Sequence, residues 1–441
     1  MNNNRTRSAR ARSTRAGWAG LVAALLLLLP ARGPSAGVPI ETAGRVEVLD
    51  HPFAPHRLFA IDGLIGRLTL VDLDDGTYLG QIDTGSGMPG AVFSRTRPEI
   101  YVPETYFSRG TRGVRTDVAS IYGARSLAVE AEVLLPPKRA NNPLAMGNAA
   151  LSDDDRFLAV FNMTPATSLS IVDVAARSLV GEVPTPGCSL VYAIGEQRFA
   201  SLCADGGLMV VELDDDGAVV RKSRTEPFFD PVSDPVTEKA VRWGSRWVFV
   251  SFEGFAHVVD FSGAEPRFEP VWSLLDDEDR EHSYRVGGAQ HLALHAASGR
   301  LYSLVHEGEV DTHKDAGTEV WVYDLASRER VQRIELTNPG FTFVGFPVVL
   351  GNDWSNAFLL DHVIPQIGID QIAVTQDDEP LLLTGAAYTG ALCVYDARTG
   401  DLVRRIFTGN MTTQGLLTRP PRATIDPSAR LPRYSAREVR E

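Results

Sequence analysis

The sequence has little of what marks several large classes of protein. Cysteine is scarce, with three residues in 441, so the fold is not expected to depend on a dense disulfide framework. Positive charge is in deficit: the formal net charge is −13, and an acidic surface repels phosphate backbones, which argues against a nucleic-acid partner. Helical periodicity of 3.6 residues is nearly absent. The starting expectation is therefore an all-β protein with few cross-links.

Familiar catalytic patterns are missing as well. The chain contains no G-x-S-x-G nucleophile elbow, no H-E-x-x-H pair and no phosphate-binding P-loop. We therefore predict no catalytic residue and no metal site in this chain.

Long apolar runs are absent except near the N-terminus. Five arginines between residues 5 and 15 precede an apolar core at 19–29, and small residues follow at 34–36. This order is typical of a secretory signal peptide, and the core is too short to span a bilayer comfortably. We predict that residues 1–36 are a cleaved signal peptide and that the mature protein is periplasmic, without membrane attachment. An uncleaved N-terminal anchor is the alternative.

One unit recurs seven times along the rest of the chain. Each copy is a β-rich strand that ends near an acidic or polar residue, followed by a tight polar turn and a second short strand. The copies lie at 67–83, 118–133, 168–183, 208–223, 256–271, 320–336 and 392–407, and they align at Asp72, Tyr122, Asp173, Glu212, Asp260, Asp324 and Asp396.

Two further strand patterns precede each copy, as in 149–161 and 292–305. A meander of four short strands cannot bury both of its faces alone, whereas stacking such units around an axis buries them and protects most edges. We therefore predict a seven-bladed β-propeller with four-stranded antiparallel blades over residues 40–418. A β-sandwich would not repeat its turn chemistry seven times, and the coils of a β-solenoid are much shorter.

The propeller topology separates short connections from long ones. Turns within the first and last strand pairs of each blade are short and share one face. The long connections share the other: 137–148, 227–240, 274–290 and 337–370 between blades, and 107–116 and 306–318 within blades. Long loops on a rigid scaffold commonly carry binding sites, so this face is predicted to receive a partner.

Two of the cysteines are placed by the same topology. Cys188 is expected just before the inner strand of the fourth blade and Cys203 at the end of the next strand, so both reach the long-loop face as neighbours. We predict a Cys188–Cys203 disulfide, with two buried free thiols as the alternative. Cys393, inside a predicted strand, is expected to be a small core residue.

Several stretches resemble the heavy chain of the methylamine and aromatic amine dehydrogenases. They are FSRGTRGVRTD (107–117), PGCSLVYAIGEQRFASLCADGGL (186–208), VGGAQHLALHAASGRLYSLVHEGE (286–309), THKDAGTEVWVYD (312–324) and IDQIAVTQDDEPLLL (369–383). The similarity runs from about residue 45 to 415.

The resemblance implies a periplasmic seven-bladed propeller with an intrachain disulfide at Cys188 and Cys203. It also implies a two-plus-two heterotetramer with a small light chain that carries tryptophan tryptophylquinone. There a primary amine would be oxidised to aldehyde and ammonia, and electrons would pass to a blue copper protein such as an amicyanin or azurin. The heavy chain would bind no cofactor itself and would frame the substrate channel.

The sequence departs from this family in three places. The family's methylamine enzymes place a channel-lining aromatic residue in the loop that matches 85–90, where this chain has Gly87 or Met88, so we expect a different and roomier access route. Residues 339–366 look like an apolar insertion between blades six and seven, which covers the light chain, narrows the channel or packs on the rim. Residues 419–441 are an arginine-rich and proline-containing segment, predicted to be a flexible tail.

Two polar loops are candidates for the light-chain interface. The first contains Phe107, Arg109, Arg112 and Arg115, and its arginines suit bidentate pairing with carboxylates of a partner; a solvated turn is the alternative. The second contains His306, His313 and Lys314. Its histidines and acids could also be taken for a metal site, but a mobile acidic loop guarantees no convergence of ligands.

A different class of function is the alternative for the whole chain. A free-standing periplasmic propeller could act as a lactonase-like hydrolase or as a protein-binding module. A hydrolase should place several carboxylates and histidines in the central pocket, but the predicted inner strands begin mostly with apolar and small residues.

Overall fold

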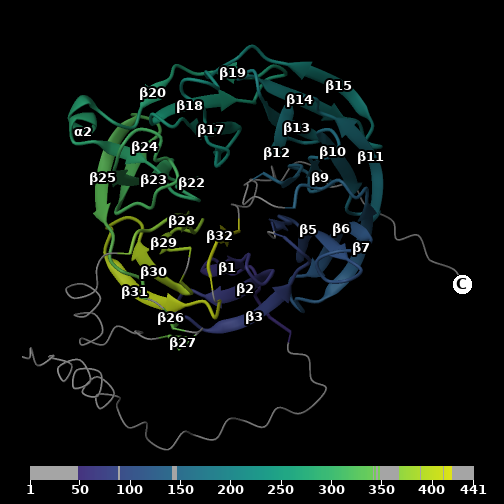
Figure 1. Ribbon diagram of the computed structural model, residues 1–441, viewed down its shortest axis with the longest axis horizontal. Coiled ribbons are helices and arrows are strands. Elements are labelled where there is room, and N and C mark those ends of the chain that lie inside the picture. Colours follow the sequence, from purple (N-terminus) through teal and green to yellow (C-terminus); the bar gives the residue numbers. More distant parts are fainter. Residues whose placement is uncertain are drawn as a thin grey trace, which may run out of the picture. The chain divides into compact units, whose positions relative to one another are not determined.

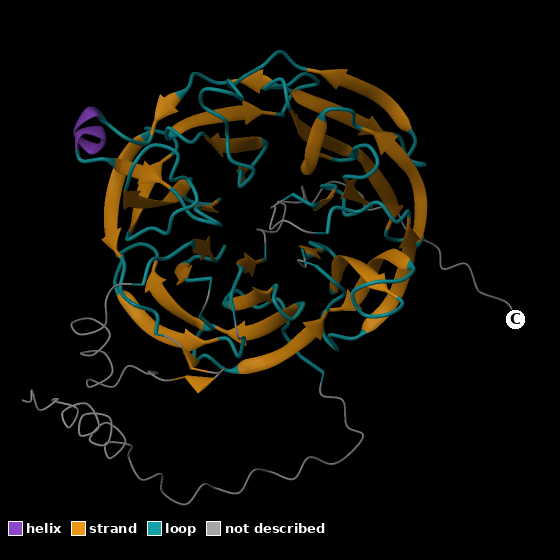
Figure 2. Ribbon diagram, viewed as in Figure 1, coloured by secondary structure: helices purple, strands orange, loops and turns teal. Residues whose placement is uncertain are grey.

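In the computed structural model, seven antiparallel sheets stand around a central axis (Figure 1). The structure describes residues 48–87, 90–141, 147–340, 367–387, 389–410 and 412–419, with the backbone of 342–343 and 346–347. The predicted signal peptide, Met88, most of the insertion and all of the tail after Arg419 lie outside the described residues. Figure 2 shows how completely strands dominate what is described, and no helix there is long and apolar enough to cross a membrane.

Each blade has four strand positions, from the axis outward. Blade 1 contains β32 (Gly415–Thr418), β1 (Arg57–Asp62), β2 (Arg67–Asp72) and β3 (Tyr78–Asp83). Blade 2 contains β4 (Val92–Phe93), β5 (Glu99–Phe107), β6 (Arg115–Gly123) and β7 (Val129–Leu135). Blade 3 contains β8 (Ala149–Leu151), β9 (Phe157–Asn162), β10 (Ser168–Asp173) and β11 (Ser178–Pro184). Blade 4 contains β12 (Cys188–Gly195), β13 (Arg198–Cys203), β14 (Leu208–Leu213) and β15 (Val219–Arg224).

The last three blades include the irregular ones. Blade 5 contains β16 (Val241–Trp243), β17 (Arg246–Val250) and β18 (Phe255–Asp260), and its outer position is shared by β19 (Arg267–Phe268) and β20 (Trp272–Ser273). Blade 6 has two inner pieces, β21 (Tyr284–Val286) and β22 (Leu292–His295), then β23 (Arg300–Glu307), β24 (Glu319–Asp324) and β25 (Glu329–Glu335). Blade 7 contains β28 (Gln371–Val374), β29 (Leu381–Gly385), β30 (Ala391–Asp396) and β31 (Leu402–Phe407). A separate pair, β26 (Thr342–Phe343) and β27 (Phe346–Pro347), lies within the predicted insertion.

The predicted seven-bladed propeller is confirmed, and the repeated sequence unit is the outer strand pair of each blade. The aligned acids end the third strand and specify the turn that follows. Asp324, for example, accepts hydrogen bonds from the backbone N–H groups of Ala326 and Ser327, both at 2.9 Å. Such side-chain-to-backbone bonds favour a turn over continued strand. In four blades this acid also faces an arginine at the start of the second strand: Arg57–Asp72, Arg198–Glu212, Arg246–Asp260 and Arg300–Asp324.

The ring is closed by joining the two ends of the chain in one sheet. Strand β32 pairs with β1 from Leu58 opposite Thr418 to Ile61 opposite Gly415. The C-terminal strand therefore becomes the inner strand of a blade whose other strands come from the N-terminal region. Apolar side chains on facing blades, such as Phe157, Phe199 and Phe249, form the buried core between neighbours.

One expected loop is more structured than its sequence suggested. Residues 274–290 contain a single helical turn, α2 (Asp277–Glu281), and the strand piece β21. The helix begins with a capping box, in which Asp276 accepts from the backbone of Asp279 and Asp279 reciprocates. A five-residue helix is too short to show periodicity, so hydrophobic patterning could not predict it.

Candidate functional site

The long connections lie at one end of the ring, here called the long-loop face. Its described residues include 84–87, 90–91, 108–114, 136–141, 147–148, 225–240 and 308–318. Isolated β-bridges tie the connections between blades to those within blades: Arg139 pairs with Asn162, Val236 with Ser251 and Gly317 with Ile369. The predicted division between long loops and short turns is confirmed.

Loop 84–87 is anchored to the end of β5. The Ser86 N–H donates to the Thr105 carbonyl at 2.7 Å, and the Gly85 N–H donates to Oε1 of Glu104 at 3.0 Å. Gly87 has a positive φ of 92°, and a Cβ atom there would lie 2.0 Å from the carbonyl oxygen of Asn141. Glycine at 87 therefore lets loop 84–87 close against the neighbouring loop at Asn141. A residue with a side chain would not fit at position 87 in this arrangement.

A buried carboxyl lies directly beneath this loop. Glu104 is 2% exposed, and Ser120 and Tyr122 also donate hydrogen bonds to it. Burial raises the pKa of Glu104, and these donors together with the Gly85 N–H oppose the shift. Neighbouring Arg139 is also buried, and burial lowers its pKa to about 10. Sequence reasoning missed this pair; the available signal was an acid within the otherwise buried strand 99–107.

The predicted arginine loop divides into two kinds of residue. Arg109 and Arg112 are exposed at its tip, with the Arg109 N–H bonded to the Arg112 carbonyl at 2.9 Å. Arg115 instead turns inward, where Nη2 lies 2.8 Å from Asp117 and 2.6 Å from the carbonyl of Arg139. Phe107 ends β5 and is half-buried. Roles for these four residues in a partner interface stay predictions. Arg109 and Arg112 are the more accessible to a partner, because both are exposed.

The second candidate loop folds back on the propeller. His306 is 4% exposed, and its Nε2 lies 2.8 Å from the hydroxyl of Thr312. The His313 ring stacks on Phe252 with centroids 3.4 Å apart, while Lys314 is exposed. Burial lowers the pKa of both histidines, so their rings are neutral near pH 7. Within the described ranges, no three His, Cys, Asp or Glu side chains gather as metal ligands.

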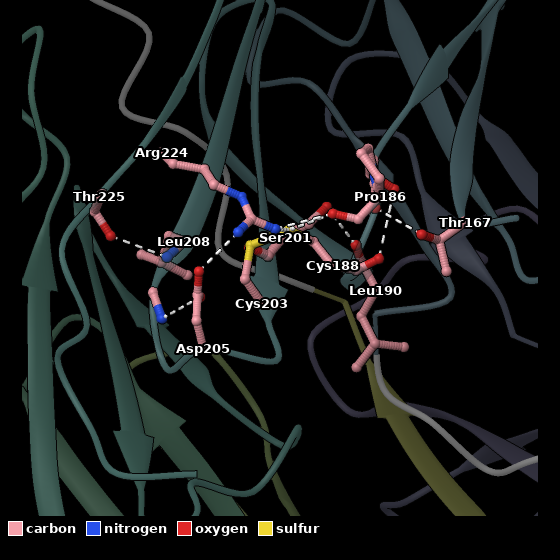
Figure 3. The surroundings of a disulfide bond; sticks show 12 residues. Thr167, Pro186, Cys188, Leu190, Ser201, Cys203, Asp205, Leu208, Arg224 and Thr225 are labelled. Carbon is pink, nitrogen blue, oxygen red and sulfur yellow. Dashed lines mark hydrogen bonds and ion pairs between the residues drawn. A yellow bond between two sulfur atoms is a disulfide. The ribbon is translucent and has the colours of Figure 1, made fainter.

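The cysteines form the expected cross-link. Cys188 and Cys203 stand opposite each other in the β12–β13 pair and are joined by a disulfide at the long-loop face (Figure 3). Arg224 lies against the disulfide, with Nη2 3.0 Å from Sγ of Cys188 and Nη1 2.7 Å from Asp205. Cys393 is buried in the core around β30, as predicted.

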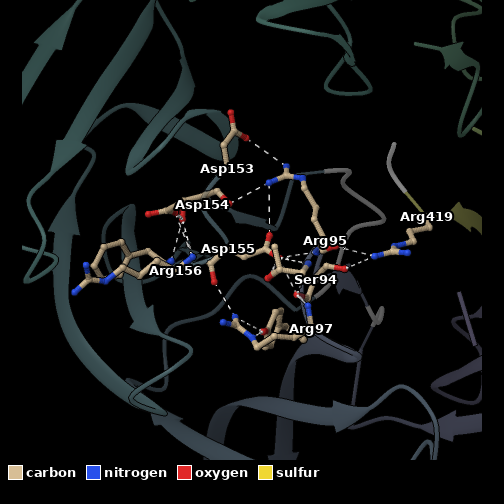
Figure 4. A network of polar contacts seen from close by, with 12 residues as sticks. Ser94, Arg95, Arg97, Asp153, Asp154, Asp155, Arg156 and Arg419 are labelled. Carbon is tan, nitrogen blue, oxygen red and sulfur yellow. Dashed lines mark hydrogen bonds and ion pairs between the residues drawn. The ribbon is translucent and has the colours of Figure 1, made fainter. Parts of the chain in front are cut away.

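The opposite end, the turn face, is tied together by charges (Figure 4). Asp153 receives two bonds from Arg242, at 2.5 and 2.6 Å, and lies 3.3 Å from Arg95. Burial raises the pKa of Asp153, but the bonds from Arg242 outweigh it and the net shift is downward. Arg419 extends the network by donating to the Arg95 carbonyl at 3.0 Å. Residues in or next to the inner strands of blades 1, 2, 3 and 5 are thereby linked.

Fold and loops define a seven-bladed propeller in which the long loops gather at one face. Comparison with known sequences goes further: the methylamine dehydrogenase heavy chain (MADH) family profile matches residues 45–340. The chain belongs to this family.

Methylamine dehydrogenase heavy chains of known sequence are similar to this chain over most of its length. The methylamine dehydrogenase heavy chain of Paracoccus versutus is 28% identical over 83% of this chain and 78% of its own. That of Methylobacillus flagellatus is 26% identical over 82% of each. Among solved structures, a protein of unknown function from Desulfotomaculum acetoxidans has a TM-score of 0.53 at 10% identity, covering 83% of this chain and 99% of that one. The last similarity shows the fold alone.

Proposed function

We propose that this chain is the heavy, channel-forming subunit of a periplasmic amine dehydrogenase. A small light chain carrying tryptophan tryptophylquinone performs the chemistry and oxidises a primary amine to aldehyde and ammonia. Electrons then pass to a blue copper protein, and two heavy and two light chains form the complex. The observation that carries the proposal is the family match over residues 45–340, which includes five blades and most of the long-loop face.

The long-loop face is the surface proposed to receive the light chain. Its loops are held by partly buried contacts, such as the hydrogen bond from Gly85 to Glu104 and the stacking of His313 on Phe252. Such anchoring lowers the entropy that a partner must remove on binding. Exposed Arg109 and Arg112 supply bidentate donors for carboxylates of the partner.

The access route for substrate is proposed to differ from that of the family's methylamine enzymes. Gly87 carries no side chain, and the loop leaves no space for one against Asn141. An aromatic side chain at residue 87 is therefore incompatible with the observed loop. Met88, the other candidate position, lies outside the described residues.

Isolation of the complex from the native periplasm tests the proposal. We expect the chain to co-purify with a small, cysteine-rich partner that has quinone absorbance and reduces a dye when an amine is added. A lone chain that hydrolyses lactones would refute the proposal.

A pair of matched variants tests the docking surface. Arg109→Glu together with Arg112→Glu should weaken light-chain binding at least about tenfold, because two cationic donors become repulsive. Arg125→Glu is the control, since Arg125 lies in the turn between β6 and β7 at the other end of the same blade and is half exposed. Equal loss in both would contradict docking at the long-loop face.

A further inference from the structure

A histidine on the turn face stands between the first and the last blade. His56 lies directly before β1 of blade 1, and Asp377 lies in the turn between β28 and β29 of blade 7, 321 residues further along the chain. Blades 1 and 7 are neighbours where the ring closes (Figure 1). A bond between His56 and Asp377 therefore joins the beginning of the propeller to its last blade.

Both ring nitrogens of His56 face oxygen atoms that accept hydrogen bonds. Nδ1 lies 2.7 Å from Oδ1 of Asp74, in the turn between β2 and β3 of the same blade. Nε2 lies 3.3 Å from Oδ1 of Asp377 and 3.3 Å from the carbonyl oxygen of Glu379. Ionised carboxylates and carbonyls cannot donate, and a neutral imidazole carries only one N–H group. The protonated ring, with an N–H group on each side, is the form that satisfies both contacts.

The charges beside the ring favour the same form. The side chains of His56 and Asp377 are 20% and 17% exposed, and within the described residues His56 is the only cationic group within 4.0 Å of the Asp74 or Asp377 carboxylate. The neighbouring Arg57 pairs with Asp72 instead, at 2.5 Å. Burial alone would lower the pKa of His56, but the hydrogen bond to Asp74 and the attraction of Asp377 and Asp74 outweigh it, so the pKa lies above its ordinary value.

Other titratable groups nearby do not replace these contacts. Asp75 and Asp378 are the next acids in the same two turns and are exposed, so water and salt screen their charges. His295 of blade 6 approaches Asp377 as well, but its Nε2 lies 3.0 Å from the carbonyl oxygen of Asp377 and not from the carboxylate. The carboxylate of Asp377 is therefore left to His56.

We propose that His56 is a proton-dependent link between blades 1 and 7. When its ring is protonated, it donates to Asp74 within blade 1 and to Asp377 of blade 7. When the proton leaves, one nitrogen becomes an acceptor that faces an oxygen atom, and one of the two contacts is lost. The stabilisation is complete below the pKa of histidine in the unfolded chain and is lost as the pH rises through the raised pKa of His56. The closure is thus firmer in acid.

Deuterium exchange of the imidazole C2 hydrogen, followed by mass spectrometry of peptides from the purified full chain, measures the pKa of single histidines. We expect the pKa of His56 to lie above the ordinary value of about 6.5 and to fall in Asp377→Asn. Asp378→Asn is the matched control, because it removes the same charge from an exposed position of the same turn. A pKa of about 6.5 or below in the parent protein, or equal shifts in the two variants, would overturn the proposal.

Amide hydrogen exchange tests the link between the blades themselves. After correction for the intrinsic effect of pH on exchange, amides of β1 and β28 should exchange about fivefold faster near pH 8.5 than near pH 5.5. His56→Gln should reduce this difference to less than about twofold, whereas His51→Gln, at an exposed position of the same segment, should keep it. If the full difference persists in His56→Gln, or disappears equally in His51→Gln, His56 does not control the closure and the proposal is wrong.

Discussion

A buried glutamine reinforces the closure of the ring, and its removal should be costly. The Gln290 side chain donates to the carbonyls of Ile372 and Leu416, at 2.9 and 2.8 Å, and accepts from the Leu416 N–H at 2.9 Å. It is 7% exposed. One amide from blade 6 thus joins the inner strand of blade 7 to that of blade 1, where the two ends of the chain meet.

The magnitude follows from these three bonds. Each is worth about 1 kcal/mol net, and Gln290→Ala leaves two carbonyls and one N–H without the bonds they make, so we expect a loss of about 3 kcal/mol. The matched control is Gln332→Ala, because Gln332 makes one exposed bond, to the Thr399 carbonyl at 2.7 Å. The control should lose less than about 1 kcal/mol.

Hydrogen exchange measures the effect where it arises. A loss of about 3 kcal/mol corresponds to roughly 100-fold faster exchange for amides that open with the closing strands, in peptides covering β28 and β32. Gln290→Glu adds a second readout. A carboxyl facing two carbonyls should have a raised pKa, so this variant should lose stability as the pH rises above the pKa of the unfolded chain. The reasoning is refuted if Gln290→Ala exchanges no faster than Gln332→Ala.

Three other changes probe the network, the cross-link and the access loop. In urea unfolding, Arg242→Met should lower the free energy of unfolding most near pH 6 and progressively less toward pH 3. Arg242 lowers the pKa of Asp153 in the folded protein, so their interaction stabilises the fold at pH values above the pKa of Asp153 in the unfolded chain, and this stability is lost as the pH falls. A difference between variant and parent that does not change with pH would contradict this. Replacing both Cys188 and Cys203 by alanine should cost about 3 kcal/mol, since the bridge closes a separation of 15 residues, and an unchanged urea midpoint would count against it. Gly87→Ala should lower the free energy of unfolding by about 1–3 kcal/mol and raise KM for the amine more than it lowers kcat. Gly90→Ala is the control, because its added Cβ would meet nothing within 4 Å, and it should change neither stability nor kinetics. Similar effects in the two variants would exclude the clash with Asn141.

The fold was predictable because its signals are local and repeated. Each acid at the end of a third strand bonds its own turn, so Asp324 and Asp396 mark their blades without reference to the rest of the chain. The Cys188–Cys203 bridge was predictable for the same reason, since it joins neighbouring strands. Contacts between distant segments carry no such signal. Gln290 bonds to Leu416 where the ring closes, and Asp153 bonds to Arg242 past blade 4. No sequence pattern near Gln290 or Asp153 predicts these partners.

The same distinction explains why the site was only partly predicted. Sequence reasoning found the loops, because length and composition are local, but it did not predict which side chains turn inward. Arg115 turns to Asp117, and His306 turns to Thr312; both were predicted to lie in polar loops, but they belong to the ends of β6 and β23.

The two ends of the ring are built for different tasks. At the turn face, Asp153 of blade 3 joins Arg95 of blade 2 to Arg242 of blade 5, so residues in or next to the inner strands of separate blades are held together. At the long-loop face, loop 84–87 is held by the strand beneath it, where the Gly85 N–H donates to Glu104 of β5. A loop held in this way can change its sequence without disturbing the ring. The proposed substrate route can therefore diverge at Gly87 while the closure at Gln290 is kept, and of these two positions only Gly87 should change KM for the amine when it is substituted.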